Sequence, residues 1–311
     1  MLALGAMAEV PVSLRSAISW ILTAGLAGSA LLFANLEGFS LQLGPRSIAV
    51  LLGLVGGNLI LMVIARRVPR YARFEIPCHC VAQFSACAIA ALIAQFPAVG
   101  LELPLVDDAL ARFDTAVGLE WPTQYAWAIA HPTIYAAMDV VYELLLPQIP
   151  VVCFIVGYAD PDRLRVFTLA NAFGLTATLA LFVLFPAAST FTRAGVMNVA
   201  EFAVQFDAVR EGGLRALDPM RLTGLISFPS YHALLAVLVA CAFARLPKLF
   251  PFVLALELAI IAFSPLIGGH YIADVLAGIA MGLLAFYAAA RIGAPRTRSE
   301  AAVRSEITSP A

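Results

Sequence analysis

Long apolar segments alternate with short polar loops along most of the chain. A segment of about 20 mostly apolar residues can cross the hydrocarbon core of a bilayer as one helix. Eight segments approach or reach this length, and the pattern predicts a membrane-spanning helix for each. The predicted spans are 16–34, 47–65, 76–96, 134–157, 165–186, 232–246, 249–267 and 271–291. The sixth is short, and Pro229-Ser230 before it is expected to cap its start.

Composition supports this membrane interpretation. Of the 311 residues, 62% are hydrophobic and 13% are charged, which is more apolar than a soluble domain of this size can bury. The expected fold class is therefore an all-α integral membrane protein with about eight transmembrane helices. The net charge of −1 and the scattered basic residues argue against nucleic acid as a partner.

The charged loops predict an orientation. Four arginines gather between the second and third spans, namely Arg66, Arg67, Arg70 and Arg73. The positive-inside rule places this loop in the cytoplasm. Alternation then puts the loops 160–165 and 245–248 and both termini on the same side. The acidic loop 97–122 and the long loop 187–231 fall on the extracytoplasmic face.

Three regions are expected along the chain. Residues 1–75 would form two N-terminal transmembrane helices and the cytoplasmic arginine-rich loop, and residues 76–291 a six-helix catalytic membrane domain. Residues 292–311 lack an apolar face and are expected to be a disordered cytoplasmic tail. Short loops and many Ala, Leu and Arg residues favour a multi-pass plasma membrane location, the inner membrane in a bacterium.

Two histidine motifs stand where loops meet apolar segments. His270 and Asp274 are four residues apart, so on a helix they share a face, and the carboxylate can orient the imidazole. His232 follows Pro229-Ser230-Tyr231 at the start of the sixth span, which the topology places at the same membrane face. An oriented histidine can act as a nucleophile, and a second histidine can protonate a leaving oxygen. The alternative is a polar pair that only stabilises a helix start.

These motifs resemble those of the phosphatidic acid phosphatase type 2 superfamily of membrane phosphatases and phosphotransferases. Pro229-Ser230-Tyr231-His232 resembles its Pro-Ser-x-His motif, and the stretch from Ser264 to Asp274 resembles its final motif, which ends in His-x-x-x-Asp. The resemblance implies a six-helix core, here preceded by two extra N-terminal helices. It also implies His270 as the nucleophile that forms a phosphohistidine, Asp274 as its orienting base, His232 as the acid and Ser230 as a donor to phosphate.

The sequence departs from the superfamily pattern in two places. The first motif needs a lysine, but the only lysine is Lys248, which follows Pro-Ser-x-His; the arginine usual after the serine of the final motif is replaced by Pro265. In both departures the sequence resembles the branch that contains inositol phosphorylceramide synthases and sphingomyelin synthases. Positive charge for the phosphoryl oxygens must then come from another residue. We favour Arg210, beside two glycines, and then Arg193.

The expected function is a phosphotransferase or phosphatase that acts on a lipid phosphate ester, with a lean toward transfer of an inositol phosphate type of head group. Its partners would be the lipid substrate and a hydroxyl acceptor, which is a lipid alcohol or water. No cofactor and no metal are expected, because Cys78-His79-Cys80 lacks a second half.

Two alternatives remain. One is a purely hydrolytic phosphatase of phosphatidate or polyprenyl phosphate. The other is a proton-coupled transporter or flippase, in which Asp139 and Glu143 would line a path. These two residues, with Asn171 and Glu257, either bond between helices or line a pocket for a polar head group.

Overall fold

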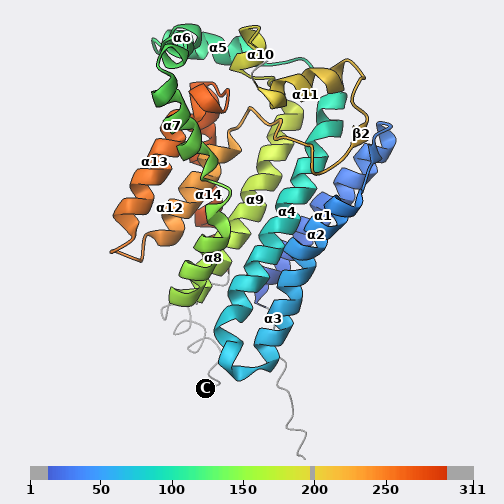
Figure 1. Cartoon of the computed structure of the whole chain (residues 1–311), viewed down its shortest axis with the longest axis vertical. Coiled ribbons are helices and arrows are strands. Elements are labelled where there is room, and N and C mark those ends of the chain that lie inside the picture. The colour runs from blue at the N-terminus through green and yellow to red at the C-terminus, as the bar shows by residue number, and fades with distance from the viewer. Residues whose placement is uncertain (1–12, 197–199, 293–311) are drawn as a thin grey trace, which may run out of the picture.

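The computed structural model describes residues 13–196 and 200–292, and these form a helical bundle. Ten helices run along the bundle (Figure 1): α1 (Leu14–Leu36), α2 (Pro45–Leu51), α3 (Asn58–Arg67), α4 (Glu75–Gly100), α7 (Pro132–Glu143), α8 (Gln148–Ala159), α9 (Pro161–Leu184), α12 (Tyr231–Phe243), α13 (Phe250–Ile267) and α14 (Ile272–Arg291). Four short helices gather at one end: α5 (Asp107–Ala116), α6 (Trp121–Ala130), α10 (Thr190–Arg193) and α11 (Glu201–Arg210). A π-helical turn (Leu52–Gly57) joins α2 to α3, and a 3₁₀ turn (Pro69–Phe74) precedes α4.

The all-α prediction is confirmed, and each predicted span falls on one or more helices, although 134–157 is interrupted by a turn at 144–147 and the sixth span ends early, at Phe243. Within the described residues, six helical segments are long and apolar enough to cross a membrane, and α7 with α8 would make a seventh although the two are bent by 47°. The helix α12 has 13 residues. At 1.5 Å per residue it is about 20 Å long, which is less than the hydrocarbon thickness of about 30 Å. The predicted count of eight crossings is therefore not confirmed.

The basic and acidic loops lie at opposite ends of the bundle. At one end Arg245 pairs with Asp160 at 3.2 Å, and Arg15 donates to the carbonyl of Ala289 at the end of α14. At the other end Asp107 and Asp114 of the acidic loop contact the residues that precede α14 or begin it. This grouping agrees with the alternation expected from the sequence. The predicted tail lies outside the described residues except for Ile292, and so do residues 1–12.

The helix α9 lies at the centre, where it packs against α1, α4, α8, α12 and α14. Beside it, α12 and α14 approach each other closely because Gly278 and Gly282 face α12. A Cβ on Gly278 would lie 2.3 Å from the carbonyl oxygen of Ser230, and one on Gly282 would lie 2.8 Å from that of Leu234. Such Gly-x-x-x-Gly pairs allow transmembrane helices to touch backbone to backbone. This contact holds the start of α12 against the start of α14.

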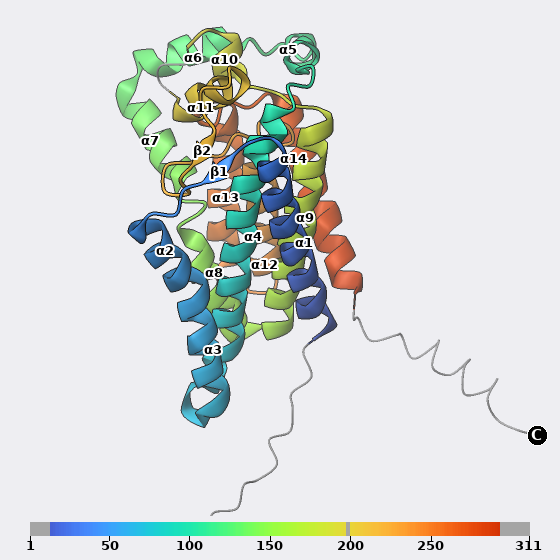
Figure 2. The same cartoon turned by 90° about the vertical axis from the view of Figure 1, so that its right-hand side faces the viewer.

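The N-terminal helices join the bundle from one side. The helix α1 packs against α4 and α9, while α3 runs along the outside of α4 and α2 continues away from it (Figure 2). The strand β1 (Ser40–Leu41) pairs in parallel with β2 (Ala216–Leu217), a two-residue contact that ties the α1–α2 loop to the loop before α12. Ser47 adds a hydrogen bond of 2.8 Å to Asp218.

Candidate active site

His270 lies in a tight loop between α13 and α14 that depends on two glycines. Gly269 has a φ of +67°, a conformation that residues with a side chain rarely adopt. A Cβ on Gly268 would lie 2.3 Å from the hydroxyl of Tyr142, and one on Gly269 would lie 2.6 Å from the ring of Phe191. Only glycine fits at either position, and this turn directs the imidazole of His270 into the bundle.

The two nitrogens of His270 have different neighbours. Nδ1 lies 3.0 Å from the carbonyl oxygen of Ser227 and 3.5 Å from Oδ2 of Asp274. A carbonyl oxygen only accepts, so Nδ1 carries the proton and Nε2 of the neutral ring keeps its lone pair. Nε2 lies 3.1 Å from the hydroxyl of Ser230, which can donate to it. The free lone pair is the property that a nucleophile requires.

The prediction that His270 and Asp274 share a helical face is wrong in its geometry. The helix α14 begins at Ile272, and Tyr271 before it is extended with a ψ of 156°. His270 therefore lies outside the helix, and the pair meets because the loop folds back over the first turn. The contact itself is present, although the spacing of four residues on a helix does not produce it.

Asp274 is held in place by several donors. Its Oδ2 accepts from the hydroxyl of Ser227 and from the backbone N–H of Tyr271, both at 2.9 Å. The second of these bonds closes the first turn of α14, so the residue caps the helix as well as facing His270. Asp274 is fully buried, and its Oδ1 has no hydrogen-bond partner among the described residues.

His232 lies in the first turn of α12, close to His270. The two ring centroids are 6.4 Å apart, and the ring of His232 stacks on that of Tyr142 with a centroid distance of 4.4 Å. Ser230 caps α12 as the sequence predicts, because its side chain accepts from the N–H of Ala233. The structure thus brings together His270, Asp274, His232 and Ser230.

The two predicted arginines lie elsewhere. Arg210 donates to the carbonyl oxygens of Leu103 at 3.1 Å and Glu102 at 3.4 Å, in the loop that follows α4. Arg193 ends α10 and pairs with Asp108. It also borders a pocket of about 290 Å³ that Tyr271 and Thr190 help to line.

Sequence reasoning missed the contacts that attach the acidic loop to this site. Tyr271 donates to Asp107 at 2.9 Å, and the first N–H of α14, from Ile272, donates to Asp114 at 3.0 Å. Burial raises the pKa of Asp114, the N–H of Ile272 opposes that shift, and the nearby Asp274 adds to it. The signal available in the sequence was a cluster of carboxylates predicted at the same membrane face as His270.

Two other polar residues of the predicted spans, Asn171 and His79, bond between helices. Asn171 on α9 accepts from the hydroxyl of Tyr231 on α12 at 2.7 Å, which is the first of the two roles expected for it. His79 accepts from the indole N–H of Trp20 on α1 at 2.6 Å. Glu257 is buried on α13, and its carboxyl oxygens have no hydrogen-bond partner among the described residues.

The fold and the site together define the class of this protein. It is a helical multi-pass membrane protein in which two histidines and a carboxylate gather at the ends of helices. Comparison with protein families gives a match to the PAP2 superfamily over residues 108–288. This chain therefore belongs to the PAP2 superfamily, whose members are generally phosphatases and phosphotransferases. The match is described at the level of the superfamily, so it does not confirm the branch expected from the sequence. Comparison with curated proteins and with solved structures gave no match.

Proposed function

We propose that this protein transfers a phosphoryl or phospho-head-group from a lipid phosphate ester through a phosphohistidine on His270. The observation that carries the proposal is the environment of His270. Its Nδ1 is fixed by Ser227 and Asp274, its Nε2 keeps a lone pair, and the ring of His232 lies 6.4 Å away. Membership of the PAP2 superfamily supports the same class of reaction.

The reaction has two steps. Nε2 of His270 attacks phosphorus, the bond from phosphorus to the lipid oxygen breaks, and His232 gives its proton to the departing alcohol. In the second step an acceptor hydroxyl attacks phosphorus while His232 takes its proton, and the bond to Nε2 breaks. The negative charge of a bound phosphate favours the protonated form of His232 before the first step. Asp274 stabilises the positive charge that develops on the ring of His270.

The phosphoryl oxygens need donors and positive charge. The hydroxyl of Ser230, which now faces Nε2, would turn to a phosphoryl oxygen when substrate enters. Of the two arginines, the contacts favour Arg193, because the N–H of Thr190 on the same short helix donates to the carbonyl of Gly269 at 3.0 Å. Arg210 is engaged with backbone carbonyls at the end of α4.

The acceptor separates transferase from phosphatase. A lipid or sugar alcohol would make the protein a phosphotransferase, and the wording of the two motifs favours this outcome, with an inositol phosphate type of head group. Water would make it a lipid phosphate phosphatase. In both cases we place the site at the extracytoplasmic face of a plasma membrane, because the arginine-rich loops lie at the opposite end of the bundle.

Labelling of His270 tests the mechanism. Purified protein in detergent would be mixed with phosphatidate or phosphatidylinositol labelled at phosphorus, quenched within milliseconds and digested, and the labelled peptide identified by mass spectrometry. We expect acid-labile label on His270, and none in a His270→Ala variant. The control is His131→Ala, because the side chain of His131 is exposed and its one hydrogen bond among the described residues is to the backbone carbonyl of Trp127. Full turnover by His270→Ala would falsify the mechanism.

The same preparation identifies the acceptor. Labelled lipid would be incubated with and without a lipid alcohol, and the products separated by chromatography. Label that moves to the added alcohol supports the transferase. Free phosphate as the only product, with alcohol present in excess, supports the phosphatase and removes the transferase proposal.

A further inference from the structure

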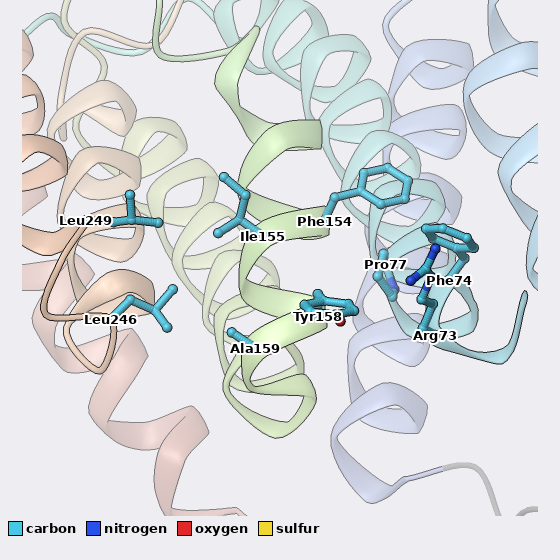
Figure 3. A pocket seen from close by; sticks show the side chains of 9 residues that line it. All are labelled: Arg73, Phe74, Pro77, Phe154, Ile155, Tyr158, Ala159, Leu246 and Leu249. Carbon is cyan, nitrogen blue, oxygen red and sulfur yellow. The ribbon is translucent and has the colours of Figure 1, made fainter.

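A second pocket lies at the end of the bundle away from His270. It has a volume of about 470 Å³ and crosses the outer face of α8. Figure 3 shows Leu246 and Leu249 on one side of this helix and Arg73, Phe74 and Pro77 on the other. We call it the α8 groove. None of the residues placed in the proposed reaction lines it.

The floor of the α8 groove is apolar and faces outward. Phe154 and Ile155 are each 38% exposed, and Tyr158 follows one helical turn later at the end of α8. Residues three and four apart share a helix face, so these side chains form one stripe that points toward the surroundings of the bundle. The flanking helices α4 and α13 belong to segments apolar enough to cross a membrane. In a bilayer, the apolar groups that meet such a stripe are acyl chains.

The polar rim of the groove carries positive charge. The guanidinium of Arg73 lies 4.9 Å from the ring centroid of Phe74 and 6.0 Å from that of Tyr158, so the aromatic rings hold it at the rim. Lys248 lies between two lining residues, Leu246 and Leu249. Among the described residues neither Arg73 nor Lys248 has an ion-pair partner.

Neighbouring cations differ in this respect. Arg66 pairs with Glu75 at 2.7 Å, and Arg245 pairs with Asp160 at 3.2 Å. Arg67 and Arg70 also have no ion-pair partner among the described residues, but Arg70 lies over the ring of Tyr71 and neither arginine lines the groove. Of the cations without an ion-pair partner among the described residues, Arg73 lines the groove and Lys248 is exposed in the loop between two of its lining residues, where a negative group above an acyl chain would be found.

We propose that the α8 groove binds an anionic phospholipid from the leaflet opposite the one that contains His270. Its phosphate lies between Arg73 and Lys248, and one acyl chain follows Ile155 and Phe154 toward the middle of the bilayer. Clusters of basic residues at the membrane edge of helices recognise anionic lipids in this way. Apolar side chains form the floor of the groove, so a membrane lipid fits it better than a soluble anion. This proposal does not depend on the reaction at His270.

The test compares lipids and variants in detergent solution. Purified full-length protein would be titrated with phosphatidylglycerol or with phosphatidylcholine of the same chains, and bound lipid counted by native mass spectrometry. We expect one tightly bound phosphatidylglycerol and no comparable phosphatidylcholine. Each basic residue near an anionic lipid contributes a factor of about five in affinity, so Arg73→Gln with Lys248→Gln should weaken binding roughly thirtyfold.

Two further variants keep the test decisive. Arg70→Gln removes the same charge from the same loop outside the groove and should leave phosphatidylglycerol binding unchanged. Ile155→Trp keeps both cations but fills the path of the acyl chain, so it should lower binding at least tenfold. Thermal unfolding without added lipid checks that each variant folds.

Three results with the lipids would overturn the proposal. These are equal binding of phosphatidylcholine and phosphatidylglycerol by the wild type, an unchanged affinity in the double variant, and an equal loss in Arg70→Gln. Binding of inorganic phosphate with the same affinity as the lipid would also overturn it, because the acyl chain would then contribute nothing.

Discussion

The two ends of the bundle treat charged residues in opposite ways. Around His270 the polar groups are buried and bonded to one another: Asp274 is fully enclosed, and Asp107 and Asp114 receive bonds from the residues beside it. At the other end most charges are exposed; some are paired singly, as Arg245 is with Asp160, and Arg73 and Lys248 have no ion-pair partner among the described residues. Buried, hydrogen-bonded groups hold a fixed geometry, whereas exposed pairs rearrange at little cost.

This difference suits the two ends to different tasks, namely phosphoryl transfer at the end with His270 and lipid binding at the other. Transfer of a phosphoryl group requires donors that are already placed before the charge develops. Binding of a lipid head group requires only positive charge close to an apolar surface. The variants below test the contrast, in order of decreasing effect.

Replacement of Asp274 by alanine should have the largest effect. It removes the carboxylate beside Nδ1 of His270 and leaves the hydroxyl of Ser227 and the N–H of Tyr271 without their acceptor. We expect kcat to fall by about 10⁴, the scale seen when the carboxylate that orients a catalytic histidine is lost. The control is Asp162→Ala at the opposite end, where the carboxylate is exposed. Steady-state kinetics of both variants measure this. Equal losses of kcat would contradict the difference described between the two ends of the bundle.

Replacement of Gly278 by alanine should disturb the site without touching its chemical groups. The new Cβ would meet the carbonyl of Ser230 and move the start of α12 away from that of α14. A shift of about 1 Å between reacting groups can cost roughly 100-fold in rate. Gly28→Ala is the matched control, because a Cβ there meets nothing within 4 Å. If the two variants keep the same kcat, the glycine contact does not position Ser230 and His232.

Replacement of Asp114 should change stability and its dependence on pH. Asp114→Ala removes the acceptor of the first N–H of α14, and loss of such a cap costs about 1 kcal/mol. Burial raises the pKa of the Asp114 carboxyl in the folded state. Its contribution to stability is thus present below the unfolded pKa and is lost as the pH rises through the folded pKa.

Asp114→Asn separates these two effects. The amide keeps an oxygen for the N–H of Ile272 but cannot ionise, so the variant should gain stability relative to wild type as the pH rises through that window. Thermal unfolding at several pH values measures this. A constant difference between the two proteins at every pH would show that Asp114 does not titrate there.

Replacement of Arg245 by glutamine should have the smallest effect. The side chain of Arg245 is 70% exposed, and ion pairs at the surface contribute less than about 1 kcal/mol. We expect a small loss in thermal unfolding and no change in kcat. A loss as large as that of Asp114→Ala would mean that the two ends do not differ in the way described.

The apolar pattern predicted most of the helices because hydrophobic length is a property of local sequence. It also placed His232 and His270 at the same end, since two successive spans must return the chain there. The cap at Ser230 followed from its residue type alone. Local rules therefore located the polar residues that meet, although no tertiary contact was used.

The remaining features depend on tertiary contacts. The backbone at Gly269 removes His270 from the helix, and the rings of Phe191 and Phe202 lie close to this glycine. The contacts of Arg193 and Arg210 depend on how α10 and α11 fold over the end of the bundle. Neither the period of apolar residues nor the charge of a loop contains this information.

The small pairing of β1 with β2 has a consequence for how the chain can be divided. The family match begins at residue 108, yet the loop that leads into Ser230 is hydrogen-bonded to residues before that limit. The N–H of Ser40 donates to the carbonyl of Arg215 at 2.8 Å, and the N–H of Leu225 donates to the side chain of Gln95 at 2.6 Å. A shortened protein that starts at residue 108 would keep every residue proposed for catalysis but lose these hydrogen bonds. The start of the family match is therefore not the start of a structural unit that could be expressed alone or fused to another protein.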